Sequence, residues 1–355
     1  MSVGVGLRAR LASGAFAVTA EIGPPRGADP EALRRKVAPL AGCVDAVNIT
    51  DNAGAHVRMA SWAGSLVVAQ AGAEPVMQLT CRDRNRLALQ SDLLAASAVG
   101  IPNVLLMTGD HPKFGDHPDA KPVFDLDSVQ LLWAARMMRD EGRLLSGRAL
   151  STRPAWLIGA VENPFAPPTG FRAARLAKKA DAGAEFVQTQ FVFDVPAFAR
   201  WMAELSDLGI PERCRILAGV GPVRSLRALD HMRTSVPGLH IPGEVDRRLR
   251  AVPADQVAAE GLRICTEIIE RLREIPGVSG VHIMAPGYEH GIPGILDRAG
   301  LAVPRDGEPG PQASGGFRGA APPGQHWPQA SGAQGSRPPG PARPAAPTPG
   351  SAGAH

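Results

Sequence analysis

The chain has 355 residues, of which 44% are hydrophobic and 5% aromatic, and its formal net charge is +4. Residues 304–355 carry four arginines against two acidic residues, a charge of +4 − 2 = +2, so the rest of the chain is nearly neutral. A nucleic-acid-binding surface needs a clustered basic stripe with interleaved aromatic rings. The composition therefore argues against a nucleic-acid partner.

Short apolar runs alternate with longer segments of helical period, which is typical of repeated βα units around a parallel sheet. In chain order the predicted strands are Ala17–Ile22, Asp45–Thr50, Pro75–Thr80, Asn103–Met107, Ala155–Ala160, Glu185–Gln190, Arg215–Val220 and Gly280–Ala285. The predicted helices are Pro30–Leu40, Val57–Ala71, Arg84–Val99, Asp127–Asp140, Phe171–Asp181, Val195–Leu208, Ser225–Thr234 and Ala254–Leu272.

Eight strands with eight helices fit a closed (β/α)8 TIM barrel, although an open doubly wound sheet gives the same local pattern. Closure is favoured because almost every predicted strand ends in a polar or Gly/Pro-containing cluster, such as residues 50–52 (TDN) and 108–110 (TGD). In a parallel barrel these ends meet at one face, where barrel enzymes keep their active sites. The pattern predicts one concave site built from many loops.

The domain organisation follows from the uneven distribution of 34 prolines and 40 glycines. From about Pro304 onward the sequence consists mainly of Gly, Pro, Ala, Ser and Gln, which cannot bury enough apolar surface to offset the entropy of ordering. We expect a lead-in over residues 1–15, a barrel over residues 16–303 and a disordered tail over residues 304–355.

The four cysteines are scattered without a CxxC pair, and the histidines show no metal-ligand spacing, so we expect free buried thiols and no metal. The N-terminus has no long apolar leader, and no window of about twenty apolar residues occurs elsewhere. These observations favour a cytoplasmic protein with no membrane partner.

Two carboxylates and one amide are candidates for chemistry. Glu21 ends an apolar strand just before Gly-Pro-Pro, so its carboxyl would project into the barrel mouth as a general acid, or cap the strand end. Asp110 follows the fourth strand and could stabilise a cation, or cap the next helix. Gln190 ends the sixth strand, and its amide suits the edge of a heterocycle or a structural role.

Three other features are less specific. Lys178 and Lys179 could reach a phosphate, or lie on a solvated helix face. The segment from Gly219 to Pro222 fails as a dinucleotide fingerprint because it lacks the third glycine. The connection from His111 to Pro122 lacks regular periodicity and suits either a lid over a cofactor or a plain surface loop.

Together these segments resemble the methylenetetrahydrofolate reductase family over about residues 16–301. Residues 20–25 (AEIGPP) are similar to its Glu-aromatic-aromatic-Pro-Pro opening, and residues 78–81 (QLTC) to its His-Leu-Thr-Cys strand. Residues 107–110 (MTGD) correspond to Leu-Arg-Gly-Asp, and residues 179–191 to a stretch that runs from Lys-x-Asp-Ala-Gly-Ala to Thr-Gln-Phe.

The resemblance implies a flavin-dependent, ping-pong reaction in which NADH or NADPH and then methylenetetrahydrofolate occupy the same place. Glu21 would protonate the bridging nitrogen of the folate and open its ring to an iminium ion. Asp110 would lie near the pyrimidine edge of the flavin, and Gln190 would bind the pterin or the nicotinamide. Hydride would then pass from the flavin to the methylene carbon.

The positions that correspond to flavin contacts in the family are Thr50, Asp51, Ala53, Gln78, Thr108, Gly109, Lys178 and Lys179, with Asp110 at the isoalloxazine ring. Several positions depart from the family pattern. Gln78 replaces a His, Thr108 an Arg and Val161 a Tyr, and a substrate-contacting aromatic is replaced by Met232. The usual cofactor is FAD, and the loss of an Arg and a His leaves FMN open.

Residues 50–52 (TDN) and 162–164 (ENP) are similar to a divergent bacterial branch of the family, whose members can need a partner subunit. We expect a homo-oligomer, with such a subunit as a further partner. Two alternatives stay open from the sequence. One is a non-catalytic or partner-dependent barrel subunit, and the other is a pterin-dependent methyltransferase, which would be colourless.

Overall fold

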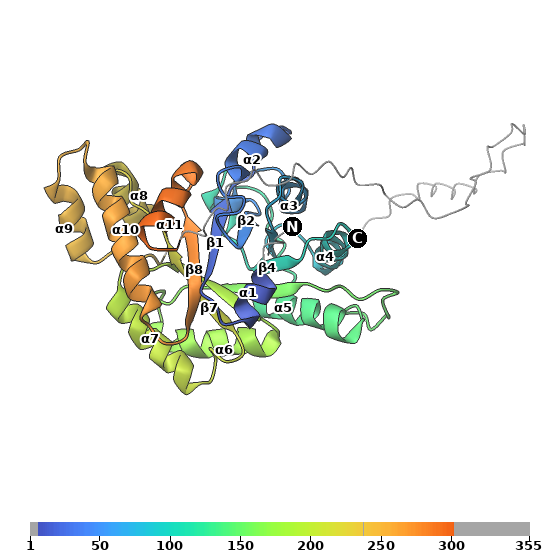
Figure 1. The fold of residues 1–355 in the computed structure, drawn as a ribbon. Helices are drawn as coiled ribbons and strands as arrows, with labels where there is room; N and C mark the ends of the chain where they lie inside the picture. Colours follow the sequence, from blue (N-terminus) through green and yellow to red (C-terminus); the bar gives the residue numbers. More distant parts are fainter. Residues whose placement is uncertain (1–5, 237, 302–355) are drawn as a thin grey trace, which may run out of the picture. The chain divides into compact units, whose positions relative to one another are not determined.

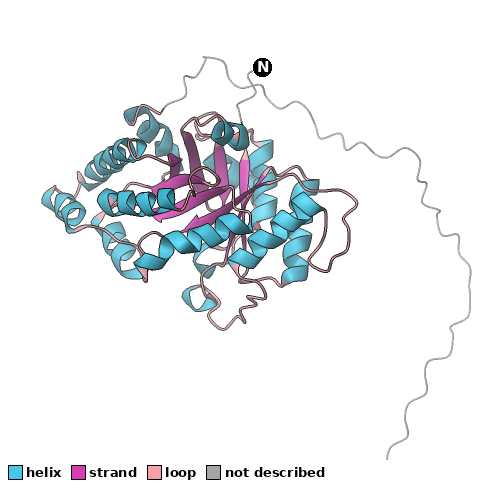
Figure 2. Ribbon diagram, turned by 90° about the horizontal axis from the view of Figure 1, so that it is seen from below, coloured by secondary structure: helices cyan, strands magenta, loops and turns pink. Residues whose placement is uncertain are grey.

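The strands of the computed structural model hydrogen-bond in the order β1 to β8, and β8 pairs in parallel with β1, so the sheet closes into a barrel. The structure describes residues 6–236 and 238–301. The strands are β1 (Ala17–Ile22), β2 (Ala46–Ile49), β3 (Pro75–Thr80), β4 (Asn103–Met107), β5 (Leu157–Glu162), β6 (Phe186–Phe191), β7 (Arg215–Val220) and β8 (Val278–Met284). Figure 1 shows the chain order, and Figure 2 shows the strands gathered at the centre with helices around them. The predicted (β/α)8 barrel is confirmed.

Helices follow the strands and cover the outside of the sheet (Figure 2). The α-helices are α1 (Leu7–Ala12), α2 (Pro30–Val37), α3 (Ser61–Gln70), α4 (Arg86–Ala98), α5 (Ser128–Arg136), α6 (Arg172–Ala182), α7 (Val195–Asp207), α8 (Leu226–Ser235), α9 (Gly243–Ala251), α10 (Val257–Arg273) and α11 (Ile292–Arg298). Short helical turns are η1 (Ala53–Ala55), η2 (Pro112–Phe114), η3 (Met137–Glu141), η4 (Thr169–Phe171) and η5 (Glu289–Gly291).

The predicted strands were close to the observed ones, with β1, β3, β4 and β7 matching at both ends. Strand β5 begins two residues later than predicted, at Leu157, whose amide starts the ladder by donating to Pro102 O. Strand β8 begins two residues early, at Val278, because a turn closed by the Ile275 carbonyl leads directly into it. Smaller shifts of one residue occur in β2 and β6.

The predicted helix Val57–Ala71 was wrong at its start, because α3 begins only at Ser61. The amide of Val57 donates to the Asp116 carboxylate, at 3.1 and 3.2 Å, and the amide of Met59 donates to Pro25 O. Because these two amides donate to acceptors in neighbouring loops, residues 57–60 do not form a helical turn. The predicted helix Asp127–Asp140 is also divided, since α5 passes into a π-helical turn at Met137.

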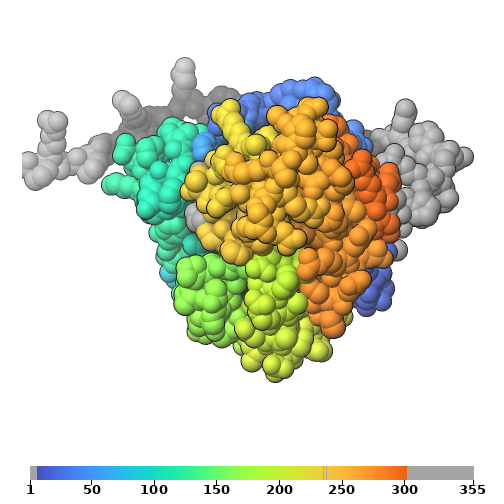
Figure 3. All heavy atoms as spheres, turned by 90° about the vertical axis from the view of Figure 1, so that its left-hand side faces the viewer, coloured from blue at the N-terminus to red at the C-terminus, as the bar shows by residue number. Residues whose placement is uncertain are grey.

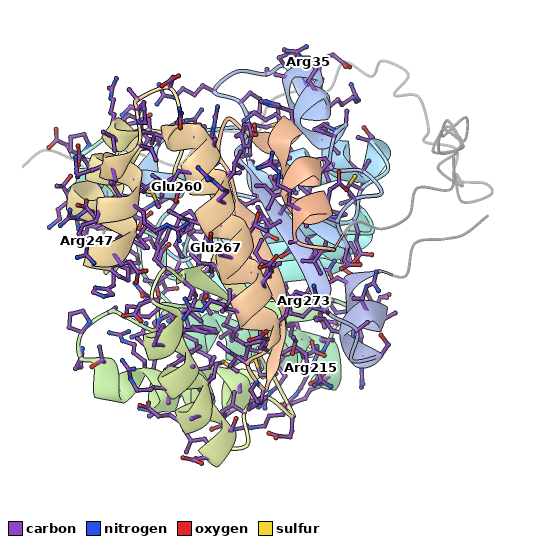
Figure 4. The ribbon with its side chains drawn as sticks, turned by 60° about the vertical axis from the view of Figure 1, so that its left-hand side comes forward. Arg35, Arg215, Arg247, Glu260, Glu267 and Arg273 are labelled. Carbon is purple, nitrogen blue, oxygen red and sulfur yellow. The ribbon has the colours of Figure 1, made fainter. Side chains whose placement is uncertain are left out.

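Helices α1, α9 and α11 were not predicted. Helix α9 is anchored to α10 by Arg248, which pairs with Glu260 and Glu267 at 2.8 and 2.6 Å. Figure 4 labels both glutamates along α10, beside α9, and Figure 3 shows α8 to α10 in gold to orange across the middle of one face. Helix α9 has too few apolar residues to show a clear helical period in the sequence. Its ion pairs with α10 supply part of its stability.

The barrel has two hydrophobic cores. The larger core lies between the sheet and the helices. The smaller core fills the inside of the barrel near the amino ends of the strands, where Leu7 and Leu11 of α1 pack against Val76, Phe186 and Leu217. Helix α1 therefore plugs one end of the barrel. The other end, at the carboxyl ends of the strands, is left for polar side chains.

The predicted disordered tail over residues 304–355 lies outside the described residues. No described helix is both long and apolar enough to cross a membrane.

Closure between β1 and β8 depends on Gly280. A Cβ at this position would lie 2.2 Å from Ala17 O, a backbone atom that cannot move without disturbing the ladder. We expect Gly280→Ala to lower the free energy of unfolding by about 1–3 kcal/mol, the usual cost of overpacking. Urea denaturation measures this change.

Gly294 provides the matched control, because it lies in α11 and a Cβ there would meet nothing within 4 Å. Gly294→Ala should leave stability unchanged or raise it by up to about 1 kcal/mol, since Ala is the better helix former. Equal effects of the two substitutions would contradict this account of closure.

Candidate active site

A cavity of about 440 Å³ opens at the carboxyl ends of the strands. The predicted site residues that line it are Glu21, Thr50, Asp51, Ala53, Gln78, Thr108, Gly109, Asp110, Lys179 and Gln190. The structure therefore brings together positions that are up to 169 residues apart in the sequence, as expected for a parallel barrel.

Two predicted site residues do not line this cavity. The exposed Lys178 turns outward, and its ammonium lies over the Phe171 ring, 5.4 Å from the centroid. Met232 of α8 is partly buried and packs against the outer core. Adjacent helix positions point about 100° apart, so only one of two neighbouring lysines, Lys179, faces the cavity.

Glu21 is the penultimate residue of β1, and its side chain is 28% exposed at the cavity mouth. Gln78 Nε2 donates to its Oε2 at 2.7 Å, and His282 Nε2 lies 3.7 Å from the same oxygen. The turn that follows is fixed by Lys36, which donates to Gly23 O at 3.1 Å. The carboxyl is thus held on a stiff strand end, with solvent access from one side.

Asp110 lies on the exposed rim of the same cavity, directly after β4. Its Oδ2 accepts from the amide of Gly54 at 3.1 Å, and the next helical turn, η2, is capped by His111 instead. The preceding Gly109 has φ of +88°, and a Cβ there would lie 2.9 Å from Thr80 Cβ. Glycine is therefore required for the tight turn that presents Asp110.

Arg82 and Arg84, which the sequence analysis did not single out, organise this rim. Arg82 is 2% exposed and donates to the carboxylate of Asp83 and to the carbonyl oxygens of Asn52 and Asp110, at 2.7–3.2 Å. Burial opposes its charge, but the hydrogen bond and charge of Asp83 outweigh this and raise the pKa of Arg82. One guanidinium thereby connects the loops after β2, β3 and β4.

The carboxylate of Asp51 serves the protein itself. It accepts from Thr80 N and Oγ1, both at 2.9 Å, and from Arg84 at 2.8 and 3.1 Å. Asp51 is 3% exposed, so these internal contacts account for its carboxylate oxygens. A flavin contact of Asp51 stays a prediction.

A cationic group lies on the β5 and α6 side of the cavity. Glu162, which is 4% exposed, accepts from Lys179 at 2.8 Å and lies 3.5 and 3.7 Å from Arg172 and Arg175. Burial lowers the pKa of Lys179, and the charge of Glu162 opposes this shift. Three cations against one carboxylate give +3 − 1 = +2, which suits an anionic group such as a phosphate.

Gln190 reaches the cavity from the end of β6. Its Oε1 accepts from the amide of Phe191 at 3.0 Å. The Nε2 group has no hydrogen-bond acceptor among the described residues. It is available to a ligand in the cavity.

The family model of methylenetetrahydrofolate reductase matches residues 6–300. The chain belongs to this family. A curated relative, a probable methylenetetrahydrofolate reductase (NADPH) from Caenorhabditis elegans, is 26% identical over 175 residues, which is 49% of this chain and 24% of that protein. The match thus spans about a quarter of the relative's length.

A solved structure from Clostridium thermocellum shares the fold, with a TM-score of 0.60 and 14% identity over 82% of this chain and 97% of that one. It is described as an uncharacterised protein that binds two copies of 5-methyl-5,6,7,8-tetrahydrofolic acid. At this identity the likeness concerns the fold alone.

The structure shows the surroundings of two positions that depart from the pattern of the methylenetetrahydrofolate reductase family. Gln78, where the family has His, donates to Glu21. Thr108, where the family has Arg, lies on a rim that already holds the guanidinium of Arg82, supplied by the neighbouring loop.

Cys43, Cys81, Cys214 and Cys265 are all buried, as predicted, and no disulfide joins any two of the described residues. Burial, aided by the charge of Asp127, raises the pKa of Cys81 to about 12, so this thiol is not a nucleophile. Within residues 6–236 and 238–301, no group of three His, Cys, Asp or Glu side chains is arranged to hold a metal ion.

The Glu162–Lys179 pair gives a test of the cationic group. We expect Glu162→Gln to lower the free energy of unfolding by about 3–5 kcal/mol, because it leaves the buried Lys179 ammonium without its counter-ion. Adding Lys179→Met should restore part of this loss. Urea denaturation of the single and double variants measures the coupling.

Glu31→Gln is the control, since Glu31 is exposed and its carboxylate pairs with Arg34 on the surface of α2. Its cost should stay below about 1 kcal/mol. Strictly additive effects of the two substitutions in the Glu162–Lys179 pair would show that the pair is not coupled.

Proposed function

We propose that this chain is a flavin-dependent methylenetetrahydrofolate reductase that interconverts 5,10-methylenetetrahydrofolate and 5-methyltetrahydrofolate with NADH or NADPH. One observation carries the proposal. The carboxyl of Glu21 and the carboxylate of Asp110 face one cavity, whose β5 and α6 side carries a net positive charge. This arrangement combines an acid, a group that stabilises a cation and an anion-binding region.

The residues present fit a flavin. A cavity of about 440 Å³ lies within the roughly 300–1,000 Å³ usual for cofactor sites. Arg172, Arg175 and Lys179 would hold a phosphate, which both FAD and FMN carry. Thr50, Ala53, Thr108 and Gly109 would line the ring system, with the absent side chain of Gly109 allowing close approach. When bound, the flavin relays hydride between the nicotinamide and the methylene carbon.

Glu21 performs the acid step. Its O–H bond breaks as an N–H bond forms on the bridging nitrogen of the folate, and the five-membered ring opens to an iminium cation. A pterin substrate is supported by the family and by the methyltetrahydrofolate-binding protein that shares this fold. In the reverse direction the Glu21 carboxylate takes the proton back.

Asp110 and Gln190 support this step. The Asp110 carboxylate, fixed by the Gly54 amide, places negative charge near the cation that forms. The free Nε2 group of Gln190 donates to the pterin, or to the nicotinamide carboxamide in the other half-reaction. The two substrates use the same cavity in turn.

An anaerobic titration tests the proposal. The yellow protein should bleach with NADH or NADPH and recover its colour with methylenetetrahydrofolate. Glu21→Gln should bleach at the wild-type rate but recover about 10²–10⁴-fold more slowly, because only the folate step needs the acid. Stopped-flow absorbance of each half-reaction measures both rates.

Glu31→Gln is again the matched control and should leave both rates unchanged. A protein that holds no flavin and takes none up would contradict the proposal. That result would favour one of the two alternatives, a pterin-dependent methyltransferase or a non-catalytic barrel subunit. Equal slowing of both half-reactions by Glu21→Gln would remove Glu21 from the acid role.

A further inference from the structure

A layer of buried polar side chains lies inside the barrel directly beneath Glu21. It consists of Thr19 of β1, Asn48 of β2, Gln188 of β6 and His282 of β8, each at most 3% exposed. The inside of the barrel just below is apolar. Buried polar groups are costly unless they are fully hydrogen-bonded. Packing alone therefore does not explain why these positions are polar.

The hydrogen bonds of this layer connect Asn48 to Thr19 through Gln188. Asn48 and Gln188 bond reciprocally, at 2.6 and 3.1 Å. The second N–H of Gln188 Nε2 donates to Thr19 Oγ1 at 3.0 Å. Since Thr19 accepts from Gln188, its own proton is free to be donated onward.

Two acceptors are within reach of the Thr19 hydroxyl. His282 Nδ1 lies at 3.0 Å and Val281 O at 3.5 Å. The shorter contact is the better hydrogen bond. With Nδ1 as the acceptor, the neutral imidazole carries its proton on Nε2, the nitrogen that faces Glu21 Oε2 at 3.7 Å.

We propose that His282 is a positioning residue for Glu21, held as the Nε2–H tautomer by the chain Asn48–Gln188–Thr19. The proposal rests on the acid role of Glu21 in the proposed function. Gln78 and His282 both face Oε2 of Glu21, while no described residue makes a hydrogen bond to Oε1. Oε1 is therefore the oxygen that carries the acidic proton to the folate nitrogen.

This geometry also serves the product of the step. When Oε1 gives up its proton, negative charge develops on the carboxylate, and two N–H groups already point at Oε2. Pre-oriented donors stabilise such charge without reorganisation during the reaction. The 3.7 Å separation can shorten when substrate binds, as catalytic hydrogen bonds often do.

Long-range ¹H–¹⁵N correlation spectra of the full-length, ¹⁵N-histidine-labelled protein test the tautomer directly. The His282 signals, assigned by their loss in His282→Gln, should show a protonated Nε2 and an unprotonated Nδ1 at pH 8. An Nδ1–H tautomer or an imidazolium at that pH would overturn the proposal. This readout does not require flavin or turnover.

Half-reaction kinetics test the positioning role. His282→Leu should slow reoxidation by methylenetetrahydrofolate about 10–100-fold, as expected for a misplaced acid, with flavin reduction unchanged and the folate KM within about threefold. His282→Gln, which keeps an N–H donor, should recover most of the rate. Equal slowing of both half-reactions, or no recovery with Gln, would overturn the proposal.

Thr19 offers a second pair of variants should His282→Leu fail to fold. Thr19→Val removes the hydroxyl at nearly constant volume and should shift the His282 tautomer and slow reoxidation, whereas Thr19→Ser should do neither. The exposed His231 on α8 is the control, as His231→Leu should change no rate. A wild-type protein that binds no flavin would contradict the proposed function. The tautomer of His282 could still be measured in that protein, so the two failures are distinguishable.

Discussion

The inward-facing positions of the barrel change from apolar to polar along the strand direction, and the site depends on this change. On β1, Ala17 belongs to the inner core, Thr19 to the buried polar layer and Glu21 to the cavity mouth. Because side chains alternate across a strand, all three point inward. Helix α1 packs on the apolar end, and the cavity opens at the other end, where polar groups converge. Because Glu21 lies on β1, the strand that pairs with β8, closure of the sheet also places the acid at the cavity mouth.

Charge in the site is arranged so that most of it stabilises the protein and little remains for a ligand. Arg82 and Arg84 neutralise Asp83 and Asp51, and in doing so they fix the loops after β2, β3 and β4. On the opposite side, three cations share Glu162 alone. Among the described residues, only there does an uncompensated positive charge face the cavity. An anionic cofactor bound there would neutralise this positive charge.

Local pattern predicted the strands and the cavity well, because strand ends in a parallel barrel must converge. It could not separate Lys179 from Lys178, since both lie in one helical segment and only the packed structure decides which faces inward. The polar layer was missed because its members are as far as 263 residues apart. A signal was present, however, as His282 lies between Val281 and Ile283 in β8, where an unpaired polar side chain would be costly.

We propose that Glu21 presents one carboxyl oxygen to a folate bound in the cavity. A crystal structure of the protein with 5-methyltetrahydrofolate tests it most directly. We predict that the pterin lies in the cavity and that the bridging nitrogen is within hydrogen-bonding distance of Glu21 Oε1, while Oε2 keeps its contacts with Gln78 and His282. A folate bound outside the cavity, or one whose bridging nitrogen lies far from Glu21, would contradict the account.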